Sequence, residues 1–416
     1  MATALAYITR RPAAFQLLPG FALTAGIFAA AMLQLFAYSA YTFRGGQLTE
    51  EVSFLAWQKF FTDPFYWGVV AKTLQLALGV TAVALLVGYP TAYALTKLRS
   101  PKLLVAAYVV IFSPLLVSLV VRVYGWLLLL SDNGVINQAL RAVGLISEPI
   151  RLIYNEAGVV IALVHILLPF MIFPILSVLL QFDHALREAA NDLGANRIQT
   201  FLRVVLPMSL PGVVAGCQIV FTLAISAFVT PELLGGGKVQ VLSRAIWFNV
   251  VDVNWPLAAV EAIVLLALAL SALALFDLAA RSLRAMRPTG APRPRRDSPG
   301  GWIDGALRIV LFAVLAFILS PLVFVVINSF NGSAFNSFPP EGFSLQWYRF
   351  VLGYGPFRDG MVNSLVIATA SMLVAVTAGM LAALALVRGK VRARGILSAF
   401  FLSPLVVPRV AIGIAV

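Results

Sequence analysis

The chain has 416 residues, of which 61% are apolar and only 11% are charged, and its net charge is +13. A soluble globular domain has about 25% charged residues, so this composition excludes a set of soluble domains, and its high hydrophobicity excludes a disordered chain. The positive charges form short clusters between long apolar runs, a pattern that indicates membrane topology rather than nucleic-acid binding.

The apolar runs predict an all-α polytopic membrane protein. A helix needs about 20 apolar residues to cross the hydrocarbon core, and the runs lack the alternation of barrel strands. The first run follows Arg10 and Arg11 and is too long for a cleaved signal-peptide core, so we expect a retained span. The predicted spans cover residues 17–39, 68–95, 103–126, 157–180, 209–232, 257–280, 306–328 and 362–387, and a ninth begins near residue 397.

Basic residues gather in alternate loops, and such loops face the cytoplasm. The basic side chains assigned to this side include Arg10, Arg11, Lys97, Arg99, Lys102, Arg187, Arg197 and Arg203. We therefore expect a multi-pass protein of the bacterial cytoplasmic (inner) membrane with a cytoplasmic N-terminus. Three parts are predicted: a six-span domain at 1–280, a basic Pro/Gly-rich cytoplasmic linker at 281–303, and a second domain at 304–416.

The chain repeats itself after the linker. Trp57 corresponds to Trp347, and Lys72-Thr73-Leu74 corresponds to Asn363-Ser364-Leu365. The offset stays at 290 or 291 residues and continues to Ser403, which matches Ser113. Six spans separate the two copies, so the second copy, of about three helices, shares the orientation of the first as a parallel repeat.

The loop after the fourth predicted span has an amphipathic pattern. Leu186, Ala190 and Leu193 fall on one helical face, and charged side chains occupy the other. Gly194 suits a left-handed residue just past a helix end. These features predict a short helix on the membrane surface, either without a partner or docked against another protein.

This loop resembles the signature loop of permease subunits of binding-protein-dependent ABC importers. The matching residues are Glu188, Ala189, Ala190, Gly194, Val204, Leu206 and Pro207, with Asp192 inside the same segment. The resemblance implies that the helix docks in a groove of a separate ATPase subunit and transmits its movement.

Further stretches look like the spermidine/putrescine branch of this family: Arg122–Trp126, Gly134–Asn137, Leu168–Met171, Phe228–Gly236 and Asn254–Leu257. Residues 300–416 resemble the beginning of the companion permease, although Arg409 stands where an acidic residue is usual. The second coupling loop would lie beyond residue 416. The resemblance therefore implies two fused permeases, the second incomplete.

No chemistry of an enzyme is visible in the sequence. Gly235–Lys238 lacks the spacing of a phosphate-binding loop, and Cys217, His165 and His184 lack metal-ligand spacing. We expect His165, in an apolar span, to be a hydrogen-bonded packing residue. We also expect no bound cofactor, no metal and no nucleic acid. ATP hydrolysis is expected on a dimer of partner ATPase subunits, and solute delivery from an extracytoplasmic binding protein.

Charged residues near the outer ends of spans have two interpretations. Arg122, with Tyr124 and Trp126, is either an interface anchor or part of the translocation path or binding-protein contact. Glu232 and Glu261 either meet a cationic solute or form helix–helix hydrogen bonds.

The expected function is that of the permease component of an ATP-driven importer working by alternating access, with a polyamine as the leading solute. Iron(III), thiamine, sulfate or another small solute is the alternative within the same class. An ion-gradient-driven transporter and a non-functional fragment are the alternatives from other classes.

Overall fold

The computed structural model describes residues 13–44, 47–49, 51–181, 184–282, 302–333, 340, 342–388, 397 and 401. It contains two compact units. The first comprises Met1–Phe60, Ile246–Leu266 and Phe343–Val416, and the second comprises Phe61–Ala245 and Ala267–Gly342. The predicted division at the linker stays a prediction, since most of 281–303 lies outside the described residues, as does most of the predicted ninth span.

Helices make up nearly all of the regular structure that is described. The first half contains α2 (Ala13–Ser39), the strands β1 (Thr42–Arg44) and β2 (Gln47–Thr49), α3 (Leu55–Thr62), α4 (Pro64–Leu95), α5 (Pro101–Phe112), the 3₁₀ turn η1 (Ser113–Leu116), α6 (Leu119–Leu130), α7 (Val135–Ala142) and α8 (Glu156–Leu180). β1 and β2 form an antiparallel hairpin in which Phe43 pairs with Leu48.

The remaining elements are α9 (His184–Asp192), α10 (Arg197–Thr200), the π-helical turn η2 (Phe201–Val205), α11 (Leu206–Ile225), α12 (Val229–Gly235), α13 (Leu242–Val251), α14 (Trp255–Ser282), α15 (Trp302–Ser329), α16 (Gln346–Gly353) and α17 (Gly355–Arg388). Eight helical stretches among the described residues are long and apolar enough to cross a membrane. The all-α polytopic class is therefore confirmed.

The third predicted span, 103–126, is wrong as a single helix. α5 ends at Phe112, Pro114 lies in the turn η1, and Val117 is extended with φ −105° and ψ 142° before α6 begins. Pro114 has no backbone N–H to donate to the oxygen of Val110, which accepts from the Ser113 hydroxyl at 2.8 Å instead. A hydropathy pattern does not detect this break because the side chains on both sides of it are apolar.

The fifth predicted span, 209–232, is wrong at its outer end. α11 stops at Ile225, and the Ser226 hydroxyl donates to the backbone oxygens of Thr222 and Leu223. The chain starts again as the seven-residue helix α12. Glu232 therefore belongs to a short separate helix, not to the end of a span.

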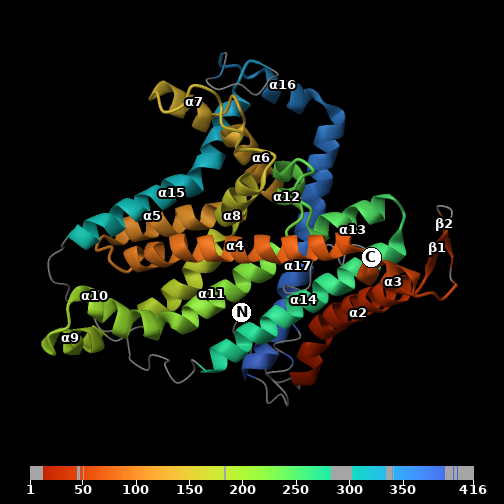
Figure 1. Ribbon diagram of the computed structural model, residues 1–416, viewed down its shortest axis with the longest axis horizontal. Helices are drawn as coiled ribbons and strands as arrows, with labels where there is room; N and C mark the ends of the chain where they lie inside the picture. The colour runs from red at the N-terminus through yellow and green to blue at the C-terminus, as the bar shows by residue number, and fades with distance from the viewer. Residues whose placement is uncertain are drawn as a thin grey trace, which may run out of the picture. The chain divides into compact units, whose positions relative to one another are not determined.

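The core of the second unit is built where α4, α8 and α11 lie side by side (Figure 1). Glycines permit this close packing around Met171. A Cβ at Gly88 would lie 2.8 Å from Met171 Cγ, and a Cβ at Gly216 would lie 2.8 Å from Met171 Sδ. Small residues let transmembrane helices approach until backbone and side chain touch, which is how helices associate in lipid.

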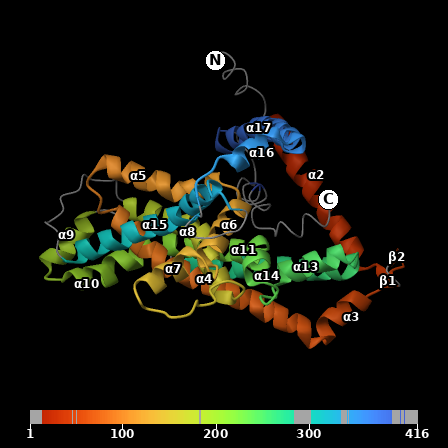
Figure 2. The same cartoon turned by 90° about the horizontal axis from the view of Figure 1, so that it is seen from above.

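α15 is part of the same unit and packs against α4, α5 and α6. At its contact with α6, a Cβ on Gly125 would lie 2.6 Å from the backbone oxygen of Pro321. The first unit contains the contact of α2 with α17, where Leu17 is buried with Ala382 and Ala385 (Figure 2).

The internal repeat is visible in the helices themselves. The series α2, α3, α4 has lengths of 27, 8 and 32 residues, and the series α15, α16, α17 has lengths of 28, 8 and 34. In both series the short helix is followed at once by a long apolar one. The order and the lengths agree with the predicted repeat, which stays a prediction because most of the ninth predicted span lies outside the described residues.

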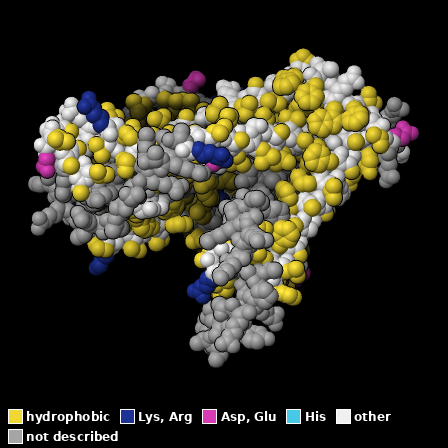
Figure 3. Space-filling model, turned by 90° about the horizontal axis from the view of Figure 1, so that it is seen from below, with side chains coloured by type: hydrophobic (Ala, Val, Ile, Leu, Met, Phe, Trp, Pro, Cys, Tyr) yellow, Lys and Arg dark blue, Asp and Glu magenta, His cyan; other side chains and the backbone are white. Residues whose placement is uncertain are grey.

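Apolar side chains are exposed on the helices. On the face shown in Figure 3, hydrophobic side chains are widespread and charged side chains are sparse among the described residues. Leu86 is 74% exposed, Val109 63% and Ile309 72%. Exposed apolar surface of this extent on long helices is what contact with lipid requires.

Candidate functional site

The loop between α8 and α11 contains the family-like segment. α9 ends at Asp192, and Gly194 follows with φ +80°, which confirms the predicted left-handed turn. α10 then begins with a capping box, in which the Asn196 side chain accepts from the Gln199 backbone N–H at 2.9 Å and the Gln199 side chain accepts from the Asn196 N–H at 3.0 Å. These contacts fix the turn between the two short helices.

The loop continues into the core without a break. α10 passes through the π-helical turn η2 into α11, and Phe201 in η2 contacts the rings of Tyr89 and Tyr93 on α4, with centroids 5.8 and 5.6 Å away. Tyr89 is also hydrogen-bonded to Ser209 of α11, oxygen to oxygen at 2.8 Å. Movement of the loop would thus be passed directly to α4 and α11.

Several apolar side chains of the loop are not covered by other described parts of the chain. Leu193 is 88% exposed, Ile198 60%, Leu202 53% and Leu186 45%; we call these four the loop apolar surface. Leu193 was predicted on the helical face, but the helix ends one residue before it, at the turn made by Gly194. Exposed apolar side chains in such a loop favour a docking surface over a solvated connection.

The structure brings the residues of the family-like pattern into one continuous segment. Glu188, Ala189, Ala190 and Asp192 lie in α9, Gly194 lies in the turn, Val204 lies in η2, and Leu206 and Pro207 open α11. The Glu188 side chain is outside the described part of the chain. The coupling role of these residues stays a prediction.

Arg122 lies in the first turn of α6 and is only 8% exposed, which favours a role inside the protein over an interface anchor. Its Nε and Nη1 have no hydrogen-bond partner among the described residues, and neither has the indole nitrogen of Trp126, one turn later. Tyr124, between them in sequence, is 37% exposed. The structure therefore brings Arg122 and Trp126 to one buried face and leaves Tyr124 outside it.

His165 of α8 belongs to the same buried region. Its Nε2 is hydrogen-bonded to the backbone oxygen of Ile318 at 3.0 Å, and its ring lies 5.5 Å from the rings of Trp126 and Phe317. The prediction of a hydrogen-bonded packing histidine is confirmed. Because the Ile318 carbonyl accepts, Nε2 carries the proton and Nδ1 is left as an acceptor without a partner among the described residues.

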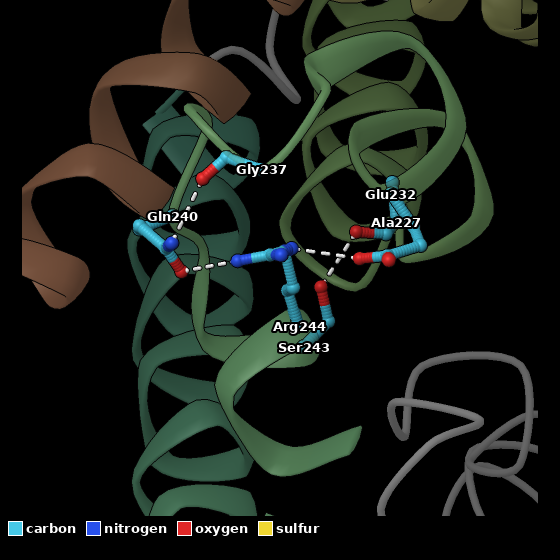
Figure 4. Close-up of polar contacts among 6 residues, drawn as sticks. All are labelled: Ala227, Glu232, Gly237, Gln240, Ser243 and Arg244. Atoms are coloured by element: carbon cyan, nitrogen blue, oxygen red, sulfur yellow. Dashed lines mark hydrogen bonds and ion pairs between the residues drawn. The ribbon is translucent and has the colours of Figure 1, made fainter. Parts of the chain in front are cut away.

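Glu232 forms an ion pair with Arg244, as Figure 4 shows. Arg244 Nε donates to Glu232 Oε2 at 2.7 Å, and its Nη1 donates to Gln240 Oε1 at 2.7 Å. Ser243 adds a hydrogen bond from its hydroxyl to the backbone oxygen of Ala227 at 2.6 Å (Figure 4). This network joins α12 to the start of α13.

Glu261 lies in α14 and is completely buried. Its Oε1 accepts from Asn249 Nδ2 at 2.9 Å, whereas its Oε2 has no hydrogen-bond partner among the described residues. Both residues belong to the first unit, and Glu232 and Arg122 belong to the second.

Three partners of acidic side chains were not predicted from the sequence. Arg244 had a signal, because it is a basic residue in a predicted outer loop, where such residues are rare. Asn249 and Lys72 had none. Lys72 forms an ion pair with Glu156, which lies 84 residues later in the chain, and no sequence pattern predicts such a contact. Within the described ranges, no group of three His, Cys, Asp or Glu residues could hold a metal ion.

Comparison with known proteins identifies a family model that matches residues 84–285 and is described as the inner membrane component of binding-protein-dependent transport systems. The spermidine/putrescine transport system permease protein PotB of Escherichia coli K12 is 37% identical over 204 residues, covering 49% of this chain and 74% of that protein. PotB of Haemophilus influenzae is 38% identical and is covered to 68% of its length. The matched region begins within α4 and includes the loop and α6 to α14.

A solved structure of a bacterial ABC transporter involved in the import of the acidic polysaccharide alginate is also similar. The aligned region covers 64% of the present chain and 92% of the alginate transporter chain, with 19% sequence identity and a TM-score of 0.49.

Proposed function

The chain belongs to the family of inner membrane components of binding-protein-dependent transport systems, and from this premise we propose that it imports polyamines such as spermidine and putrescine at the expense of ATP. The permease role follows from the family. The solute is proposed from the PotB relatives, which include proteins from two genera at 37% and 38% identity.

The observation that carries the coupling role is the loop from α9 to η2. It exposes the four side chains of the loop apolar surface and is joined to α4 through Phe201. A partner ATPase that binds this surface gains a rigid connection to the helices of the core. Glu188, Ala189 and Ala190 are the residues that we expect to enter the groove of the ATPase.

In the proposed mechanism, two ATPase subunits close on ATP and pull on this loop. α4 and α11 move with it and convert an inward-facing cavity into an outward-facing one. ATP drives transport only if the two states differ in their affinity for the ATPase dimer and for the solute-loaded binding protein. This chain binds no cofactor itself, and its N-terminus is on the cytoplasmic side.

An anion importer is the second candidate, because Arg122 offers two buried N–H groups that have no acceptor among the described residues. A guanidinium suits a sulfate or carboxylate group, whereas it repels a polyamine.

Uptake by vesicles tests the proposal. The chain is reconstituted with its ATPase and binding protein, and uptake of labelled spermidine, putrescine and sulfate is measured with and without ATP. ATP-dependent uptake of the two polyamines alone is expected. Uptake of sulfate instead would replace the polyamine with an anion.

Co-purification tests the coupling loop separately. We expect Glu188→Arg to abolish both co-purification of the ATPase and uptake, while Glu148→Arg, a matched change in a predicted outer loop, leaves co-purification unchanged. Full co-purification and uptake in Glu188→Arg would contradict the coupling role.

A further inference from the structure

Glu261 is the only acidic side chain that is buried among the described residues. It lies within α14, and its neighbours along that helix, Val260 and Ala262, are also completely buried. A carboxylate in apolar surroundings is unfavourable unless it meets a cation or binds a proton.

Asn249 provides a hydrogen bond to only one of the two carboxylate oxygens of Glu261. Its side-chain amide donates to Glu261 Oε1 at 2.9 Å and so holds the carboxyl group in one orientation. Oε2 is buried and has no partner in the described part of the chain. The exposed Lys59 acts on Glu261 electrostatically, yet no hydrogen bond joins the two side chains within the described residues.

Three other carboxylates in the described helices are paired with cations. Glu232 is held by Arg244, Glu156 by Lys72 and Asp277 by Arg281. Pairing neutralises these groups toward a cationic solute. Glu261 differs from these three because its Oε2 is buried and has no hydrogen-bond partner among the described residues.

We propose that Glu261 and Asn249 form an intramembrane subsite that receives one ammonium group of a polyamine during transport. This inference rests on the proposed function. An ammonium group has three N–H donors and a carboxylate only accepts, so Oε2 takes one donor, and the amide oxygen of Asn249 takes a second. Glu261 is closed to solvent in this structure, so the ammonium group enters in another state of the transport cycle.

Chemical protection of Glu261 tests the subsite directly. A hydrophobic carbodiimide, which modifies membrane-buried carboxyl groups, is applied to the complete transporter in nanodiscs during ATP turnover with the binding protein present. Labelling of Glu261 is measured by peptide mass spectrometry. We expect saturating spermidine to reduce this labelling at least fivefold, and the uncharged 1,6-hexanediol to leave it unchanged.

Transport by variants supplies the second measurement. Glu261→Gln keeps an oxygen that accepts from Asn249 but replaces Oε2, which has no partner, by an amide N–H donor. We therefore expect the KM for spermidine uptake to rise at least tenfold. The amount of assembled transporter is expected to be normal. Asp277→Asn is the matched control, since it removes an exposed carboxylate from the same helix. We expect its KM to equal that of the unaltered chain.

The two measurements separate this inference from the proposed function. Equal labelling with and without spermidine overturns the subsite, and so does an unchanged KM in Glu261→Gln. If the unaltered chain takes up no polyamine, the proposed substrate falls. If spermidine still reduces the labelling of Glu261 in that case, the ammonium subsite is supported. If spermidine does not reduce the labelling, the subsite is overturned as well.

Discussion

Arg244 Nε lies 2.7 Å from Glu232 Oε2, although the two residues lie in different short helices, α13 and α12, neither of which was predicted from the sequence. The Arg244 side chain is 10% exposed and that of Glu232 is 32% exposed, so water screens the pair only in part. The ion pair therefore joins α12 to α13 and makes this segment one structural piece.

Exchange of the two charges tests this connection. Glu232→Gln and Arg244→Gln each leave one charge without its partner, so we expect each to lower the yield of folded transporter. The double change Glu232→Arg with Arg244→Glu restores the pair in reverse. A double-mutant cycle on thermal stability, made from the two single Gln variants and the double Gln variant, is expected to give a coupling energy of about 1–2 kcal/mol. Strictly additive effects would contradict the pairing.

Gly194 sets the angle between α9 and α10 with its positive φ of +80°. A side chain at this φ costs about 1–2 kcal/mol, although the surrounding space is open. We expect Gly194→Ala to weaken co-purification of the ATPase severalfold, because α9 then adopts a different angle. Asparagine tolerates this conformation better, so Gly194→Asn serves as the control and is expected to retain most of the binding. Equal binding by all three chains would show that the turn has no part in docking.

Phe201 connects the loop to α4 through its contacts with Tyr89 and Tyr93. We expect Phe201→Ala to uncouple the transporter, so that ATPase activity persists while uptake falls at least tenfold. Phe201→Tyr keeps the ring and is the matched control. The test is the ratio of ATP hydrolysed to solute taken up, which we expect to rise in Phe201→Ala. An unchanged ratio in Phe201→Ala would rule out this contact as the route of coupling.

Gly125 permits the contact of α6 with the backbone of Pro321 on α15, where an added Cβ would lie 2.6 Å from the carbonyl oxygen. We expect Gly125→Ala to destabilise the protein by about 1–3 kcal/mol, because backbone atoms have to move apart. Gly79 of α4 has no atom within 4 Å of its added Cβ, so Gly79→Ala is the control and is expected to be neutral or slightly stabilising. Thermal unfolding in detergent measures both, and a Gly125→Ala protein as stable as the control would show that the helices do not touch there.

The family-like loop was predicted well because its features are local. The amphipathic pattern of α9 depends on residues three or four positions apart, and the left-handed turn at Gly194 depends on one residue that lacks a side chain. The contact of Phe201 with α4 was not predictable in this way, since Tyr89 and Tyr93 lie more than one hundred residues earlier in the chain.

The amino-acid sequence alone predicts an all-α membrane protein with a repeated helix order and a short amphipathic helix before α11. Hydropathy, helix length and glycine placement act on neighbouring residues, so their effects can be read along the chain. Which charges have partners is visible only in the three-dimensional arrangement of the helices. Glu232 and Glu261 looked alike in sequence, yet Arg244 pairs with the first and Asn249 leaves one oxygen of the second open. The reason is physical, because the state of a buried charge depends on the groups that surround it in space, whatever their distance along the chain.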